Sequence, residues 1–355
     1  MKTAHSREIG EGRASNGFLA FPHQFESMLG IELSGVSRVP IKRPESDEPR
    51  LATPIIKAVN LYKDYGKFRA VDGIEFQVFP GEIFGMLGPN GAGKTTTMRM
   101  LACISPVTAG ELHVDGLNVM DHPRQIRDRI GVVAQQDGLD PDLNVMQNLT
   151  VYARYFGMTG RVAEHRAREM LEFFELENRS SDGIHTLSGG MKRRLALARA
   201  FMTRPRIVIL DEPTTGLDPQ SRNRVWEQLE RIKAAGATIF MSTHYMEEAA
   251  ALCDRIVIMD HGKILANGTP DDLVLEHAGV ETAIVRPVLD RRKEVELALA
   301  ALDVEYRDRG RAIAVFNRNG AKLNLDGLAN ATVKTRASTL EDVFLNLTGR
   351  ELKDD

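Results

Sequence analysis

The stretch "GPNGAGKTT" at 88–96 fits the pattern G-x-x-x-x-G-K-[ST]. It follows the apolar run "EIFGML" and precedes a helix-like segment, which is the context that a phosphate-binding loop requires. Its glycines would let the backbone turn and aim N–H groups at phosphate oxygens, Lys94 would reach the β- and γ-phosphates, and the Thr95 hydroxyl would ligate Mg²⁺. We predict nucleoside triphosphate binding by Gly88, Pro89, Asn90, Gly91, Ala92, Gly93, Lys94, Thr95 and Thr96. An ordinary glycine turn before a helix is the alternative.

Two adjacent carboxylates follow a short apolar run in "RIVILDEP". Asp211 ends a predicted buried strand and can hold the magnesium shell. Glu212 comes next, at the sheet edge where ligands bind, and could accept a proton from an attacking water; a solvated strand-end charge is the alternative. His244 follows the similar run "TIFMST". We expect it at the same edge, where a γ-phosphate contact is favoured over the role of an ordinary histidine.

A second turn of the anion-binding type lies almost a hundred residues after the first, in "LSGGMKRR". Ser188 can cap a helix that begins at Gly189, and Gly189 and Gly190 leave the helix N–H groups bare. We expect the basic residues that follow to lie at a surface or an interface. Within one chain this turn has no phosphate to bind.

The elements that position these residues alternate along the chain. Short β-rich runs separated by longer helices are typical of a parallel sheet covered on both faces, and an antiparallel strand group is expected at its start. After about residue 280 the pattern becomes β-α-β-β-α-β, which predicts a small ferredoxin-like domain. Its last segment, "STLEDVFLNLTG", carries Ser338 and Glu341 at capping-box spacing and Gly349 as a stop. We expect three regions: a mostly disordered extension at 1–52, the α/β domain at 53–280 and the small α+β domain at 281–355.

Composition narrows the functional classes. The chain has 355 residues and a net charge of −3, so its overall charge gives no support for nucleic-acid binding. Two cysteines are too few for a disulfide framework. No apolar stretch approaches eighteen residues, and the N-terminus lacks a signal peptide. We therefore expect a protein that does not itself span the bilayer and that is soluble or peripheral through a partner.

The motifs "GPNGAGKTT", "LSGGMKRR", "ILDEPTTGLD" and "STH", in this order, resemble the ATP-binding subunit of an ABC transporter over about residues 55–279. The resemblance implies a P-loop NTPase sheet with an antiparallel β subdomain and a helical subdomain at about 136–195. It also implies ATP and Mg²⁺ as cofactors and ATP hydrolysis coupled to transport. Two subunits would form a head-to-tail homodimer in which Ser188, Gly189 and Gly190 close over the γ-phosphate bound by the partner.

The resemblance extends to individual residues. Tyr65 in "DYGK" matches the aromatic residue that stacks on adenine, although an exposed strand-end tyrosine is the alternative. Gln135 in "IGVVAQQ" matches the glutamine that touches Mg²⁺ and the attacking water, with Ala134 where the family usually has proline. Asp218 in "TGLD" matches the residue that links the two nucleotide sites. The implied catalytic set is Glu212, His244, Gln135 and Lys94, and the implied metal set is Thr95, Gln135 and Asp211.

The segments "RYFGM", "THYMEEA" and "STLEDVFLNLTGREL" are similar to the exporter branch, which includes antibiotic-resistance and nodulation-factor (lipo-oligosaccharide) ATPases. This resemblance implies a separate integral membrane permease, docked through "LNVMQNLTVYARYFGM" and the helices after it. It places the chain peripherally at the cytoplasmic face of the inner membrane. The alternatives are a soluble ABC ATPase of the DNA-repair or translation type and the ATPase of an importer. This chain lacks the long coiled coil expected of the DNA-repair type and the second cassette expected of the translation type.

Overall fold

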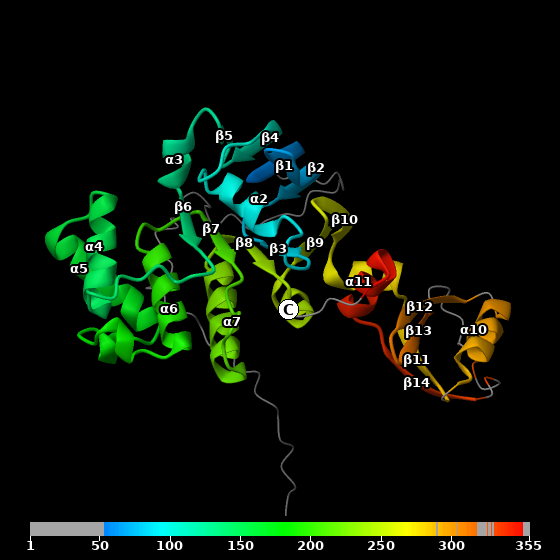
Figure 1. Ribbon diagram of the computed structural model, residues 1–355. Coiled ribbons are helices and arrows are strands. Elements are labelled where there is room, and N and C mark those ends of the chain that lie inside the picture. Colours follow the sequence, from blue (N-terminus) through cyan, green and yellow to red (C-terminus); the bar gives the residue numbers. More distant parts are fainter. Residues whose placement is uncertain are drawn as a thin grey trace, which may run out of the picture.

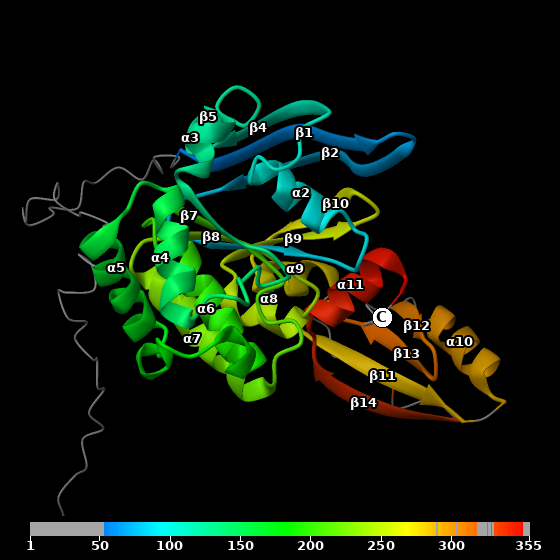
Figure 2. The ribbon, with the colours of Figure 1, turned by 60° about the vertical axis from the view of Figure 1, so that its left-hand side comes forward.

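The computed structural model describes residues 53–288, 290–302, 304–317, 325, 328 and 330–350. The expectation for residues 1–52 lies outside this part of the chain. The described residues form three sheets with helices packed around them (Figures 1 and 2). No helix in these ranges is both long and apolar enough to cross a membrane.

The central sheet has six strands in the order β10-β9-β3-β8-β7-β6. All neighbours are parallel except β10, which pairs antiparallel with β9. The strands are β3 (Ile83–Leu87), β6 (Ile130–Val133), β7 (Ile207–Asp211), β8 (Thr238–Thr243), β9 (Arg255–Asp260) and β10 (Lys263–Gly268). This sheet confirms the predicted parallel α/β architecture.

The central strands are buried on both faces because alternate side chains enter two separate cores. In β7, Val208 and Leu210 join the core beneath helices α6 (Gly189–Ala200), α7 (Pro219–Ala234) and α8 (Met246–Leu252). Ile207 and Ile209 join the core beneath helix α2 (Lys94–Leu101). A period of two along the strand therefore sorts the apolar run between two helical layers.

The expected antiparallel strand group is also present. Its four strands lie in the order β2-β1-β4-β5: β1 (Ile56–Tyr65), β2 (Phe68–Val78), β4 (Ala109–Val114) and β5 (Leu117–Asn118). Its core includes α2 and the short helix α3 (Pro123–Arg127). On the other side of the central sheet lies a helical group of α4 (Val145–Tyr155), α5 (Gly160–Phe173), the 3-10 turns η1 (Glu177–Arg179) and η2 (Ile184–Thr186), and the start of α6 (Figure 1).

The C-terminal part of the chain forms a third, antiparallel sheet after helix α9 (Pro270–His277). Its order is β12-β13-β11-β14, which is the ferredoxin-like strand order. The strands are β11 (Glu281–Pro287), β12 (Glu305–Arg309), β13 (Ala312–Phe316) and β14 (Ala331–Ala337), with helix α10 (Arg292–Ala301) between the first two in sequence. The second helix expected between β13 and β14 falls largely outside the described residues.

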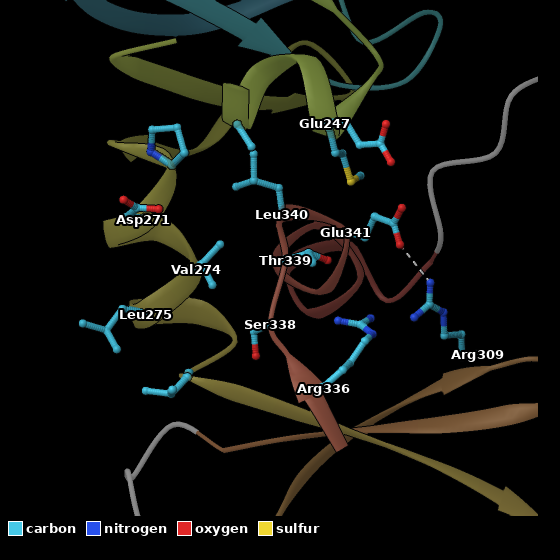
Figure 3. A pocket seen from close by; sticks show the side chains of 15 residues that line it. Glu247, Asp271, Val274, Leu275, Arg309, Arg336, Ser338, Thr339, Leu340 and Glu341 are labelled. Atoms are coloured by element: carbon cyan, nitrogen blue, oxygen red, sulfur yellow. Dashed lines mark hydrogen bonds and ion pairs between the residues drawn. The ribbon is translucent and has the colours of Figure 1, made fainter. Parts of the chain in front are cut away.

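The last helix, α11 (Leu340–Thr348), returns to the first domain. Val343, Phe344 and Leu345 are buried in the same core as α8 and α9. Its capping box is formed by Thr339 and Asp342, so the predicted Ser338–Glu341 box was one residue out of register. Figure 3 shows the junction, where a cavity of ≈ 580 Å³ is lined by α8, α9, β14 and the first residues of α11. The predicted stop is confirmed, because Gly349 ends α11 with φ +71°.

Candidate nucleotide site

The loop between β3 and α2 has the backbone that a phosphate cradle needs. Gly91 and Gly93 adopt φ of +79° and +105°, a region that side chains disfavour. Gly88 has no room for a side chain, because a Cβ there would lie 2.1 Å from the carbonyl oxygen of Met259. Gly93 is the N-cap of α2 and no side chain accepts from the first turn, so these N–H groups can serve an anion.

Lys94 lies at the floor of this loop and is almost completely buried. Its ammonium donates to the carbonyl oxygens of Gly88 (2.7 Å) and Pro89 (3.0 Å) and lies 3.7 Å from Glu212 Oε1. Burial lowers the pKa of Lys94, and the nearby carboxylates act against that shift. The cation is thus held between the loop and the carboxylate, where the phosphates of a nucleotide could compete for it.

Asp211 joins the loop to the neighbouring strand. Its Oδ1 accepts hydrogen bonds from Thr95 Oγ1 (3.3 Å) and Ser242 Oγ (2.6 Å). Ser242 lies opposite Asp211 in the β7–β8 ladder. The hydroxyl and carboxylate oxygens of Thr95 and Asp211 are hard ligands that suit Mg²⁺, which usually takes only one or two protein carboxylates beside water and phosphate.

Glu212 is the centre of the site. Its Oε1 lies 3.2 Å from His244 Nδ1, and its Oε2 accepts from Gln135 Nε2 (3.2 Å) and Thr215 Oγ1 (3.2 Å). His244, Lys94 and Thr215 together hold the pKa of Glu212 below its usual value, with the hydrogen bond from His244 as the largest cause and burial acting against it. The carboxylate is therefore ionised at neutral pH.

The backbone at Glu212 is strained. Its φ of +47° is unusual for a residue with a side chain, and its N–H is held by the carbonyl oxygen (3.2 Å) and the hydroxyl (3.1 Å) of Ser242. Such conformations persist where the surrounding structure enforces them, and they cluster at functional sites. The strain turns the carboxylate out of the strand toward Lys94 and His244.

Arg193 holds the backbone around Glu212 in this conformation. Its burial corrects the expectation that the basic residues after Gly190 lie at a surface or an interface. Arg193 and Arg194 are buried, with 4% and 6% of their surface exposed. Arg193 donates to the carbonyl oxygens of Ala134 (2.7 Å), Asp211 (2.9 Å), Glu212 (3.1 Å) and Pro213 (2.7 Å). One guanidinium thus connects α6 to the ends of β6 and β7. Arg194 donates to the carbonyl oxygen of Phe174 (3.0 Å).

The second glycine turn lies apart from the phosphate loop of the same chain, with α6 and α2 well separated in both views (Figures 1 and 2). The predicted helix start is confirmed, because Ser188 caps α6 and accepts from the N–H of Met191 at 3.3 Å. Ser188 and Gly189 are exposed. Gly190 packs against α7, where a Cβ would lie 2.5 Å from Ser221 Oγ. The exposed residues therefore face outward from the chain.

Two further predicted residues lie at the margins of the site. Asp218 is the N-cap of α7 and accepts from the N–H of Ser221 at 2.9 Å, a bond that is among the causes of its lowered pKa. Tyr65 ends β1 and is 46% exposed, with Lys63 Nζ 4.9 Å from its ring centroid. Its free ring surface could stack on a planar base.

The contacts gather Lys94, Thr95, Gln135, Asp211, Glu212 and His244 at one edge of the sheet. Ser188, Gly189 and Asp218 are exposed, and no contact described here joins them to this cluster. Sequence reasoning missed Arg193, Thr215 and Ser242. Ser242 could have been found by aligning the parallel strands β7 and β8, whereas Arg193 carried no signal that distinguished it from a surface cation.

Comparison with known proteins fits this geometry. The ABC transporter family profile matches residues 71–215. The chain is 41% identical to the Nod factor export ATP-binding protein I of Cupriavidus metallidurans over 304 residues, covering 85% of this chain and 100% of that protein. It is 44% identical to the protein of the same name from Burkholderia pseudomallei, covering 82% and 96%. The chain belongs to the ATP-binding proteins of ABC transporters.

Solved structures of ABC ATP-binding proteins share the fold. An ATP-binding subunit of an ABC transporter has 30% identity and a TM-score of 0.57, and covers 62% of this chain and 92% of that one. A dimeric ATP-binding cassette in a post-hydrolysis state, bound to ADP and Pi, has 28% identity and a TM-score of 0.56, and covers 60% and 98%. The chain is accordingly an ATP-binding ABC ATPase with an additional C-terminal sheet.

Proposed function

We propose that this ABC ATPase powers export through a separate membrane permease. The observation that carries the proposal is the Glu212 carboxylate, which is held at the end of β7 by His244 and Gln135 beside the phosphate-loop lysine. Export is supported by the relatives, which are named Nod factor export proteins. We infer a lipo-oligosaccharide or drug-like cargo. The importer and soluble ABC ATPase alternatives gain no such support.

In this proposal Glu212 orients the attacking water and accepts its proton. A carboxylate with a lowered pKa is ionised but is a weak base. When phosphates engage Lys94, its ammonium is drawn from Glu212, and the pKa of Glu212 rises toward the range in which proton transfer is easier. His244, which lies beside the Glu212 carboxylate, would contact the γ-phosphate. Much of the acceleration would come from positioning and charge, as is general for phosphoryl transfer.

The residues present suit magnesium, which when bound neutralises charge on the β- and γ-phosphates. Thr95 and Asp211 offer a hydroxyl and a carboxylate oxygen on facing elements, already 3.3 Å apart. Gln135 reaches the same place from the end of β6 through its bond to Glu212. We infer that these three side chains hold the ion and its water shell.

The exposed glycine turn supports a head-to-tail homodimer. Ser188 and Gly189 present a helix N-terminus with no phosphate of their own chain to bind. In the proposed dimer this turn closes over the γ-phosphate bound by the partner, and Asp218 connects the two sites. Tyr65 would stack on the adenine. A dimeric ATP-binding cassette of the same fold supports this arrangement.

The proposed permease contact lies on the helical group. The segment 143–158 carries α4, in which Tyr155 is 84% exposed. Gln135 precedes this group in the sequence and donates to Glu212, so we infer that a permease contact on the group acts on the site through Gln135. Through this partner the ATPase would sit peripherally at the cytoplasmic face of the inner membrane, without nucleic acid as a partner.

The test of the proposed mechanism is Glu212→Gln. Turnover should fall by about 10²- to 10⁴-fold, the range that general-base catalysis contributes, while ATP binding persists. Glu247→Gln, which changes an exposed carboxylate at the start of α8, is the matched control and should retain turnover. Unchanged hydrolysis in the Glu212 variant would remove this residue from the role of base.

A further inference from the structure

The turn between β9 and β10 forms the back wall of the phosphate loop. The N–H of Gly262 donates to the carbonyl oxygen of Ala92 at 3.0 Å. The carbonyl oxygen of Met259 occupies the space where Gly88 would carry a Cβ. Because these contacts join backbone to backbone, a displacement of the turn displaces the loop.

This turn is strained, and the Asp260 carboxylate is one of the groups that hold it. His261 has φ +45°, and its N–H donates to Asp260 Oδ1 at 3.1 Å. The Asp260 side chain is only 9% exposed, whereas its partner Arg350 is 50% exposed, and His261 Nε2 lies 3.8 Å from Asp260 Oδ2. Removal of Arg350 would leave a nearly buried carboxylate with a weaker partner. Arg350 Nη2 lies 2.7 Å from Oδ1 and 2.8 Å from Oδ2 of Asp260.

Arg350 belongs to the C-terminal part of the chain, immediately after α11. At the start of α11, Glu341 forms an ion pair with Arg309 (3.1 Å; Figure 3). In the middle of the helix, Phe344 is buried in the core. Gly349 then turns the chain toward the phosphate loop. A cavity of ≈ 710 Å³ lies between the tip of that loop at 89–91 and the β12–β13 turn, with Arg350 in its wall.

We propose that Arg350 is a positioning residue for ATP binding, acting through Asp260 and the β9–β10 turn on the phosphate loop. The inference rests on the proposed role of that loop. It gives the C-terminal sheet a function in the ATPase cycle, because a ligand or partner that shifts α11 would change the affinity for ATP. The chemical step remains with Glu212, so the effect falls on binding more than on turnover.

The experiment measures ATP and ADP binding by calorimetry, and KM and kcat, on the full chain. Arg350→Ala should weaken ATP binding about five-fold, equivalent to about 1 kcal/mol, and raise KM in step while kcat stays within about two-fold. Arg350→Lys, which keeps the charge, should recover part of the loss. Asp260→Asn should weaken binding similarly, and the double variant should be no worse than the weaker-binding single one. Arg291→Ala, which breaks an ion pair with Glu294 on the same sheet domain, is the matched control and should bind as wild type.

Two results would overturn the inference: ATP binding by Arg350→Ala that matches the Arg291→Ala control, or losses from Arg350→Ala and Asp260→Asn that add in full. Lys94→Ala separates this failure from that of the proposed function. If Lys94→Ala loses ATP binding and Arg350→Ala does not, only the positioning role fails. If ATP binding survives Lys94→Ala, the proposed phosphate loop fails, and this inference fails with it.

Discussion

Replacing Arg193 with alanine should damage both stability and catalysis, because this side chain ties three elements to the Glu212 backbone. Its guanidinium donates to four carbonyl oxygens at 2.7 to 3.1 Å. A hydrogen bond to a charged group is worth about 1.5–3 kcal/mol, so the gross loss is roughly 6–12 kcal/mol. Removing the buried charge also removes its desolvation cost of several kcal/mol. We expect a net loss of about 3–5 kcal/mol in the free energy of unfolding, out of a typical total of about 5–15 kcal/mol.

Urea unfolding monitored by circular dichroism measures this loss as a shift of the midpoint at unchanged slope. Lys192→Ala is the matched control from the same helix and should shift the free energy of unfolding by less than about 0.5 kcal/mol. Arg193→Lys should recover little, because an ammonium cannot reproduce the planar fork. Turnover should fall with Arg193→Ala even where the protein stays folded, since the strained Glu212 backbone loses its support. A loss below about 1 kcal/mol with unchanged turnover would show that Arg193 does not support the Glu212 backbone.

The remaining predictions concern helix packing and a buried carboxyl group. Gly190→Ala places a Cβ 2.5 Å from Ser221 Oγ, which is too close, so stability and hydrolysis should fall. Ser221→Gly in the same chain should restore part of both, and no rescue would contradict the packing argument. Glu248 is fully buried against Thr214 and Trp226, and burial raises its pKa. A raised folded-state pKa gives stability that is present below the unfolded-state value of 4.5 and lost as pH rises. Glu248→Gln should therefore gain stability relative to wild type as the pH rises above the unfolded-state value of 4.5, measured by thermal unfolding. A difference that does not change with pH would count against this.

The sequence predicts the phosphate loop and the carboxylate pair well because these features are local. Glycines with positive φ, a lysine at a helix start and an apolar strand ending in Asp211 each act within a few residues. The cap at Ser188 and the alternation of strands and helices were predictable for the same reason. The geometry of Glu212 follows from these local signals together with the parallel strand register.

Long-range contacts were not predictable. Arg193 is a cation in a basic segment, and such residues are mostly exposed; its burial depends on four carbonyl oxygens from distant strands. Helix α11 has an apolar face, but the pattern does not say that this face packs against α8 and α9. Arg350 likewise meets Asp260 across 90 residues of sequence. A single sequence does not indicate which distant residues will pair.

We expect the exposed turn at Ser188 to complete the ATP site of a second copy. Light scattering on Glu212→Gln, which should hold ATP without hydrolysing it, measures this association. The mass should be about 39.4 kDa without nucleotide and about twice that with Mg²⁺ and ATP. Adding Ser188→Arg to Glu212→Gln should keep the mass at the single value while leaving ATP binding intact. A Glu212→Gln protein that binds ATP and stays monomeric, or a dimer that survives Ser188→Arg, would contradict the account.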